Sequence, residues 1–213
     1  MRCEIVVPVG PGHEDIYKRA VESVRMASMD KGPFKEIGMR LIDDSNGELG
    51  RSKARNQGVE EADADYLFFL DADDVLHPSC FANFSSYAGY DACWGAIVEL
   101  RNGVAGWRYQ VPKLFTYEQL LAFDPYQTLQ MGHFVRTEVA QKHPFNEELD
   151  TGEDWDYYLR VWKDHKCIKI DQPFFLNDRT RHSTGPKAAT GRDWMDVVYP
   201  MMQEARNAHD RAA

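Results

Sequence analysis

The sequence of 213 residues lacks paired cysteines, long apolar runs and a surplus of positive charge. Its four cysteines, at positions 3, 80, 93 and 167, are scattered and form no Cys-x-x-Cys pair. This spacing argues against a zinc ribbon or a disulfide framework, and it favours a reduced, cytoplasmic compartment. No segment approaches the roughly 20 apolar residues that a membrane span requires, so we expect no membrane span.

The charge balance limits the kinds of partner. There are 34 acidic and 25 basic residues, which gives a formal net charge of -9. Nucleic acids and anionic membranes need clustered basic residues, so neither is expected as a partner. A small anionic ligand remains possible because it needs only a local basic pocket. The length suits one α/β domain with a sizeable core.

Apolar strands alternate with helical segments in the first half of the sequence. We expect strands near residues 3–9, 39–42 and 66–70, and helices near 14–29 and 51–61. This alternation predicts a parallel sheet with right-handed crossovers. The carboxyl ends of the three strands then meet at one edge, which brings together residues 8–10, 43–45 and 71–73.

The second half is less regular. We expect short strands near residues 91–100, 107–111, 167–170 and 174–176, a helix near 116–123, and a second helix into which residues 149–156 lead and which runs to about 164. Asn102-Gly103 is typical of a tight hairpin turn between the first two of these strands. The tail is amphipathic, and a break is expected at Pro200. These patterns predict a smaller mixed region beside the parallel sheet.

A cluster of carboxylates, Asp71-Ala72-Asp73-Asp74, follows the apolar run that ends at Leu70. Ligands of open α/β sheets bind outside the carboxyl ends of the strands. Adjacent carboxylates repel one another, so their grouping suggests a bound cation such as Mg²⁺ or Mn²⁺, or a role in proton transfer. The alternative is a plain turn and helix start, and Asp74 is expected to be only such a helix-start acid.

Three further segments carry candidate site residues, each with a structural alternative. Asp43-Asp44-Ser45 could bind a base or ribose, or form a simple Asx turn. Arg55 and Asn56 could bind an anion near a helix start, or lie on a solvated helix face. Glu153-Asp154 could act chemically, or merely complement the dipole of the helix that they begin. The neighbouring Trp155 could pack on a sugar ring or in the core.

In this order the motifs resemble those of family 2 glycosyltransferases with the GT-A fold. The motifs are Ile5-Val6-Val7-Pro8-Val9, Asp43-Asp44-Ser45, Ala54-Arg55-Asn56-Gln57-Gly58, Phe69-Leu70-Asp71-Ala72-Asp73-Asp74, Phe145-Asn146-Glu147-Glu148-Leu149 and Gly152-Glu153-Asp154-Trp155-Asp156. The resemblance runs from about residue 2 to residue 183. It implies one GT-A domain, in which a Rossmann-like, mostly parallel sheet is flanked by helices beside a smaller mixed acceptor-side region. Residues 1–100 would form the nucleotide-sugar-binding half, and residues 101–213 the acceptor-side half with C-terminal helices.

The resemblance also implies roles for matching residues. Asp44 would hold a uracil ring, Asp71 would contact the ribose or sugar, and Asp154 would be the catalytic general base. A metal ion, Mn²⁺ or Mg²⁺, would be bound by Asp73 and His182. The predicted substrate contacts are Pro8, Val9, Asp44, Arg55, Asp71, Glu153, Trp155 and Arg181. Four aromatic residues could line the acceptor pocket or pack in the core: Trp94, Trp107, Trp155 and Tyr157.

The implied reaction transfers a hexose from a UDP-sugar, by default UDP-glucose, to a hydroxyl group of a glycan or other acceptor. Inversion at the anomeric carbon is expected, with no covalent enzyme intermediate. The C-terminal region is short for the family, which is compatible with one domain of a larger glycosyltransferase.

Two other functions are considered. Residues 71–75, Asp-Ala-Asp-Asp-Val, also fit the start of a haloacid-dehalogenase-type phosphatase, in which the first Asp is a nucleophile. That family begins with this motif and places its acidic metal motif downstream, whereas here Asp43-Asp44 comes earlier. A catalytically silent module that binds sugar nucleotides is the third alternative.

Overall fold

The computed structural model describes residues 1–180 and 190–212. The strands are β1 (Arg2–Val9), β2 (Glu36–Asp43), β3 (Tyr66–Phe69), β4 (Val75–Leu76), β5 (Ala92–Arg101), β6 (Val104–Trp107), β7 (His133–Arg136) and β8 (Cys167–Asp178). The α-helices are α1 (Tyr17–Ala27), α2 (Gly50–Glu60), α3 (Cys80–Phe84), α4 (Tyr117–Ala122), α5 (Thr137–Lys142), α6 (Glu153–Asp164) and α7 (Gly191–Ala212). Two short 3₁₀ turns, η1 (Ser85–Tyr87) and η2 (Pro125–Gln127), complete the described elements.

The strands form one mixed sheet in the order β2-β1-β3-β7-β5-β8-β4, and β6 pairs with β5. The pairs β1–β2 and β1–β3 are parallel, which confirms the parallel arrangement predicted for the first half. Strand β7 is antiparallel to both β3 and β5, and β5 is parallel to β8. Strands β1, β2, β3, β5 and β8 therefore all run in one direction, and their carboxyl ends share one edge of the sheet.

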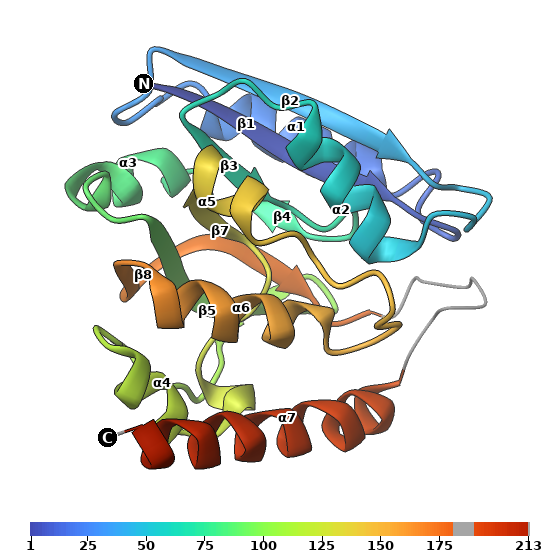
Figure 1. The fold of residues 1–213 in the computed structure, drawn as a ribbon. Coiled ribbons are helices and arrows are strands. Elements are labelled where there is room, and N and C mark those ends of the chain that lie inside the picture. The colour runs from blue at the N-terminus through green and yellow to red at the C-terminus, as the bar shows by residue number, and fades with distance from the viewer. Residues whose placement is uncertain (181–189, 213) are drawn as a thin grey trace.

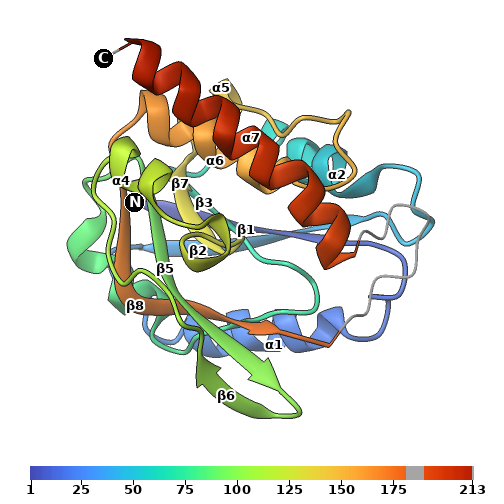
Figure 2. The same cartoon turned by 90° about the horizontal axis from the view of Figure 1, so that it is seen from below.

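Helices cover both faces of the sheet (Figures 1 and 2). Alternate residues of β3 belong to the two cores: Phe69 is part of the cluster that includes residues of α2, α5, α6 and α7, whereas Phe68 is part of the cluster that includes residues of α1 and α3. All four residues of β3 are buried, as expected for a strand with both faces covered. The central position of β3 fixes the acidic turn that follows it at the middle of the sheet edge.

The crossover helix α2 lies unusually close to β1. An added Cβ at Gly58 would overlap the side chain of Val6, so only glycine allows this approach. The contact sets how α2 sits on the sheet, and thereby where Arg55, one turn earlier on the same helix, is placed.

Several local predictions are wrong. Asp74 does not begin a helix, because it is followed by β4, and α3 starts only at Cys80. The helix does not break at Pro200, which lies inside α7. Strand β8 is continuous where two strands were expected, and β7 was not predicted at all.

The predicted hairpin turn is confirmed. Asn102 and Gly103 both have positive φ, 50° and 79°, and they close the β5–β6 hairpin as expected. The four cysteines are buried and free. Within residues 1–180 and 190–212, no helix is both long and apolar enough to cross a membrane.

Candidate functional site

Asp44, directly after β2, connects the end of β1 to the loop that precedes α2. The backbone N–H of Asp44 donates to the carbonyl oxygen of Val9 at 2.8 Å. The carboxylate of Asp44 accepts the backbone N–H groups of Leu49 and Gly50, each at 2.8 Å, and Asp44 is only 4% exposed. It thus holds the loop that leads into α2. Each carboxylate oxygen keeps a further lone pair, so this structural role leaves room for a donor group of a ligand.

Arg55 joins the two predicted halves of the site. Its Nη2 donates to Asp71 Oδ1 at 2.7 Å, and its Nη1 donates to Glu153 Oε1 at 2.9 Å. Arg55 is 4% exposed, and its guanidinium group also lies over the Phe145 ring, 5.4 Å from the centroid. One side chain therefore bridges the end of β3 and the start of α6.

Asn56, the next residue along α2, fixes the loop before α6. Its Oδ1 accepts the backbone N–H of Phe145 at 2.8 Å, and its Nδ2 donates to the carbonyl oxygen of Phe145 at 2.9 Å. Nδ2 lies 3.0 Å from Glu147 Oε1 as well. The motifs around residues 55 and 145, which are distant in the sequence, are in direct contact.

Asp73 lies beside a residue that the sequence analysis missed. Its Oδ2 is 3.7 Å from His13 Nε2, and this interaction raises the pKa of the imidazole. His13 follows the Gly10-Pro11-Gly12 turn after β1, and Gly12 has a φ of 87°. Nothing in the sequence indicated that this turn would bring His13 to the acidic cluster.

The acidic turn can be tested for its fit to a divalent cation. The side chain of Asp73 is 22% exposed. Across residues 1–180 and 190–212, no group of three or more His, Cys, Asp or Glu side chains is placed to hold a metal. Mg²⁺ and Mn²⁺ sites commonly use one or two carboxylates, with phosphate oxygens and water as the other ligands. Asp73 fits an ion held mainly by a bound diphosphate, whereas His182 and Arg181 lie outside the described residues.

Asp74 has a structural role in place of the predicted one. Its carboxylate accepts hydrogen bonds from Asn177 Nδ2 at 3.0 Å and from the backbone N–H of Asp178 at 2.8 Å. Burial, together with the charges of Asp73 and Asp71, raises the pKa of Asp74 well above its ordinary value. The side chain thus ties the acidic turn to the carboxyl end of β8.

Asp154 has the properties of a base near neutral pH. Helix α6 begins after Gly152, whose φ is 76°, and its first two residues are Glu153 and Asp154. Glu153 is ion-paired with Arg55, whereas within the described parts of the chain Asp154 has no ion-pair partner. Burial, and then the charge of Glu153, raises the pKa of Asp154 to about 7.

The aromatic residues predicted near the acceptor mostly belong to the core. Trp155 is 1% exposed and packs edge to face on Tyr158, so its burial does not support a sugar contact. Trp94 and Tyr157 are also buried, as the core alternative required. Only Trp107, at 65% exposed, presents its ring to solvent.

Two buried titratable residues were not predicted. His133 stacks on Trp94 with ring centroids 4.4 Å apart, and burial lowers its pKa to about 3. Lys169 donates to Gln110 Oε1 at 3.0 Å and to the carbonyl oxygen of Thr128, and burial lowers its pKa to about 7. Both residues lie within strands, where the sequence pattern signals only burial.

Comparison with known proteins gives matches in sequence. The family model described as Glycosyl transferase family 2 matches residues 19–138. The uncharacterized glycosyltransferase YwdF of Bacillus subtilis is 30% identical over 133 residues, which cover 57% of this chain and 47% of YwdF. The uncharacterized glycosyltransferase MJ1057 of Methanocaldococcus jannaschii is 22% identical over 139 residues, which cover 62% of this chain and 47% of MJ1057. The chain spans about half the length of the curated relatives that it matches.

Solved structures match in fold. The structure of S. aureus TarS 1-349 with UDP-GlcNAc has a TM-score of 0.69 at 15% identity, covering 96% of this chain and 66% of that one. Glucosyl-3-phosphoglycerate synthase from Mycobacterium tuberculosis, with Mn²⁺, UDP-glucose and phosphoglyceric acid, has a TM-score of 0.52 at 16% identity, covering 95% and 79%. These likenesses confirm the predicted fold, a mixed sheet flanked by helices.

Proposed function

Because this chain belongs to glycosyl transferase family 2, whose model matches residues 19–138, we propose that it transfers a hexose from a UDP-sugar to an acceptor hydroxyl group. The observation that carries the proposal is the bridge made by Arg55. This single guanidinium group joins Asp71, at the predicted donor end of β3, to Glu153, which adjoins the predicted base. The family match also decides between the two enzyme classes considered for the acidic turn, in favour of the glycosyltransferase over the phosphatase.

The donor half of the proposed site lies at the edge formed by β1, β2 and β3. Asp44 would bind the uracil ring through its remaining lone pairs, with Pro8 and Val9 beside it, and Asp71 would contact the ribose or the sugar. UDP-glucose is the default donor. Support for a UDP-sugar comes from the fold neighbours, which were solved with UDP-GlcNAc and with UDP-glucose.

Asp73 would hold a divalent cation, Mn²⁺ or Mg²⁺, and His182 is a predicted second ligand. A cation bound there would neutralise the negative charge that grows on the departing diphosphate. Asp71 is held by Arg55, which leaves Asp73 as the carboxylate available to the ion.

The proposed chemistry is a single displacement with inversion. The acceptor oxygen attacks the anomeric carbon, the bond from that carbon to the UDP oxygen breaks, and the hydroxyl proton moves to the Asp154 carboxylate. Arg55 positions the start of α6 by pairing with Glu153, so Asp154 stays in place as the acceptor binds. Arg181 and Glu153 are the remaining predicted substrate contacts.

The rate should depend on the protonation of Asp154. Its pKa is raised to about 7, so the carboxyl group is protonated below that pH and can accept no proton. We expect kcat/KM to fall about tenfold for each pH unit below 7 and to level off above it, because kcat/KM reports the free enzyme. A pH profile measured with saturating metal tests this. A decline that begins only near pH 4 would assign the base to an ordinary, exposed carboxylate.

Donor and metal can be tested together by thermal shift. Nucleotide sugars with uracil, guanine or thymine bases are added with and without Mn²⁺, and we expect stabilisation by the UDP-sugars that grows with the metal. Asp73→Asn should remove the metal-dependent part of the shift. Asp171→Asn is the matched control, because Asp171 lies in the middle of β8 and pairs with Lys113. If no nucleotide sugar raises the Tm of the wild-type protein, the proposed function is wrong.

A further inference from the structure

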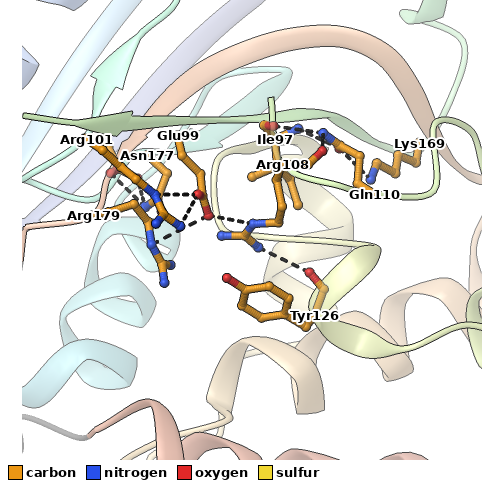
Figure 3. Close-up of polar contacts among 10 residues, drawn as sticks. Ile97, Glu99, Arg101, Arg108, Gln110, Tyr126, Lys169, Asn177 and Arg179 are labelled. Atoms are coloured by element: carbon orange, nitrogen blue, oxygen red, sulfur yellow. Dashed lines mark hydrogen bonds and ion pairs between the residues drawn. The ribbon is translucent and has the colours of Figure 1, made fainter. Parts of the chain in front are cut away.

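Three arginines surround one carboxylate beside the β5–β6 hairpin (Figure 3). Arg101 and Arg108 belong to the hairpin and the residue after it, and Arg179 follows the end of β8. Glu99 Oε1 lies 2.8 Å from Arg108 Nε and 3.6 Å from Arg179 Nε. Glu99 Oε2 lies 2.7 Å from Arg101 Nη2. Although burial opposes it, the hydrogen bonds from Arg101 and Arg108 lower the pKa of Glu99, so the carboxylate stays charged. The group has two more positive than negative charges, in a chain whose net charge is -9.

Two of these arginines line a pocket of about 530 Å³ together with aromatic rings. The Arg108 guanidinium lies 4.4 Å from the centroid of the Tyr126 ring and donates to the carbonyl oxygen of Tyr126 at 3.3 Å. Trp107 and Tyr109 also line the pocket and are exposed. Such a pocket offers fixed guanidinium donors for an anion and flat rings for the apolar face of a sugar.

The pocket and the acidic turn lie at the same edge of the sheet. Strands β5 and β8 run in the same direction as β3, so the hairpin extends from the edge of the sheet at which Asp71 lies. The carboxylate of Asp74 accepts the backbone N–H of Asp178, one residue before Arg179. The arginine group is thus connected to the acidic turn through one hydrogen bond and one peptide unit.

We propose that this pocket binds an anionic saccharide, a sugar that carries a phosphate or a carboxylate. Arg101, whose side chain is 64% exposed, reaches the anion from the open side, and the rings of Trp107 and Tyr109 pack on the sugar. Arg179 does not line the pocket, but it adds positive charge beside it through its ion pair with Glu99. Arg108 is held by Glu99 and Tyr126, so it adds a preorganised charge at the base of the pocket. That the saccharide is part of the acceptor rests on the proposed function, whereas its binding does not.

The intrinsic fluorescence of Trp107 provides a direct assay. Glucose 6-phosphate and glucuronate are titrated into the full chain, with glucose and inorganic phosphate as the uncharged and the sugar-free probes. We expect at least one of the two anionic sugars to change the fluorescence and to bind at least about tenfold more tightly than glucose or phosphate. Whichever binds more tightly shows whether the anion is a phosphate or a carboxylate. Trp107→Phe should abolish the signal, which assigns it to the pocket.

Variants then test the arginines. Arg101→Gln should weaken the binding of the anionic sugar about tenfold or more, because it removes a charged donor from the pocket. The double variant with Arg179→Gln should weaken it at least as much, because it also removes the positive charge beside Glu99. Arg211→Gln, in the last turn of α7, is the matched control and should bind as the wild type does. The C-terminal end of α7 lies away from the β5–β6 hairpin (Figure 2). The Tm of each variant shows that it is folded. Equal binding of glucose and its 6-phosphate, or unchanged binding by Arg101→Gln, would overturn the proposal, and equal binding of inorganic phosphate would overturn its saccharide part.

Failure here is distinguishable from failure of the proposed function. The wild-type protein is tested separately for stabilisation by UDP-sugars. If UDP-sugars stabilise it and no anionic sugar binds, the pocket assignment alone is wrong. If an anionic sugar binds and no nucleotide sugar does, the pocket stands and the proposed donor is wrong.

Discussion

Asp154→Asn is expected to lower kcat by a factor of about 100 to 10,000 while UDP-sugar binding is retained. The amide has nearly the shape of the carboxyl group but cannot accept the acceptor's proton. Burial raises the pKa of the native carboxyl group to about 7 because it disfavours the charged form, so a neutral group at this position should fold normally. Steady-state kinetics give the rate, and the thermal shift with a UDP-sugar gives the binding.

Asp156→Asn is the matched control for that experiment. Asp156 lies on the same helix, and its carboxylate pairs with Arg160 at 2.6 Å, away from the Arg55 bridge. We expect its turnover to stay within about twofold of the wild type, because an exposed pair of this kind contributes little. An unchanged rate in Asp154→Asn would refute the assignment of the base. Binding of UDP-sugar without any turnover in the wild type would favour the catalytically silent module.

Arg55→Met is expected to lower the free energy of unfolding by about 3–5 kcal/mol. The substitution removes the positive charge that compensates Glu153, a carboxylate that is 3% exposed, and it also releases the partly exposed Asp71. Urea denaturation measures the loss. Donor binding should weaken as well, because Asp71 loses the contact that orients it.

Two further variants test the origin of this loss. Lys53 lies on the same helix, and its side chain is exposed. Lys53→Met should therefore change the free energy of unfolding by no more than about 0.5 kcal/mol. In Arg55→Met, Glu153 keeps its ion pair with Arg51, whose Nε lies 3.8 Å from Glu153 Oε1, beyond hydrogen-bond distance. Adding Glu153→Gln should therefore recover part of the loss, since the buried charge that has lost its hydrogen-bonded partner is then removed. If Arg55→Met alone costs under 1 kcal/mol, as is ordinary for an exposed pair, the bridge is not a buried ion pair in solution.

The parallel half of the fold could be predicted because its signals are local. The run from Tyr66 to Leu70 is apolar at every position, which indicates a strand covered on both faces, and the structure buries it completely. Once the strands are known to be parallel, their ends must meet at one edge, so the grouping of Asp44, Asp71 and Asp73 follows from topology. The hairpin turn at Asn102-Gly103 was predictable for the same reason, since its two residues suit positive φ.

The contacts between distant segments could not be predicted. Arg55 was expected to bind an anion near a helix start, but its partners are two carboxylates, one of them 98 residues away. No pattern within α2 signals that pairing. Asp74 has the same sequence context as a helix cap, and only the return of β8 shows that it binds Asn177 and the backbone of Asp178.

The sequence left open whether each aromatic residue contacts a ligand or packs in the core, and its burial in the structure answers that question. Trp155 follows two site carboxylates, yet the helical turn of about 100° per residue directs its ring into the core beside Tyr158. Trp107 lies on β6, where burial falls away at the sheet edge, and its ring is exposed. Neighbouring residues in a motif can therefore face opposite environments.

The Arg55 bridge has a further consequence for how the two substrates influence each other. Any ligand that draws Asp71 toward itself changes how tightly the guanidinium group holds Glu153, and the reverse is equally true. Linkage requires that the factor by which donor changes acceptor affinity equals the factor by which acceptor changes donor affinity. Cooperativity between the two substrates would therefore reside in one side chain of α2, and it would disappear in Arg55→Met even in conditions that keep the variant folded.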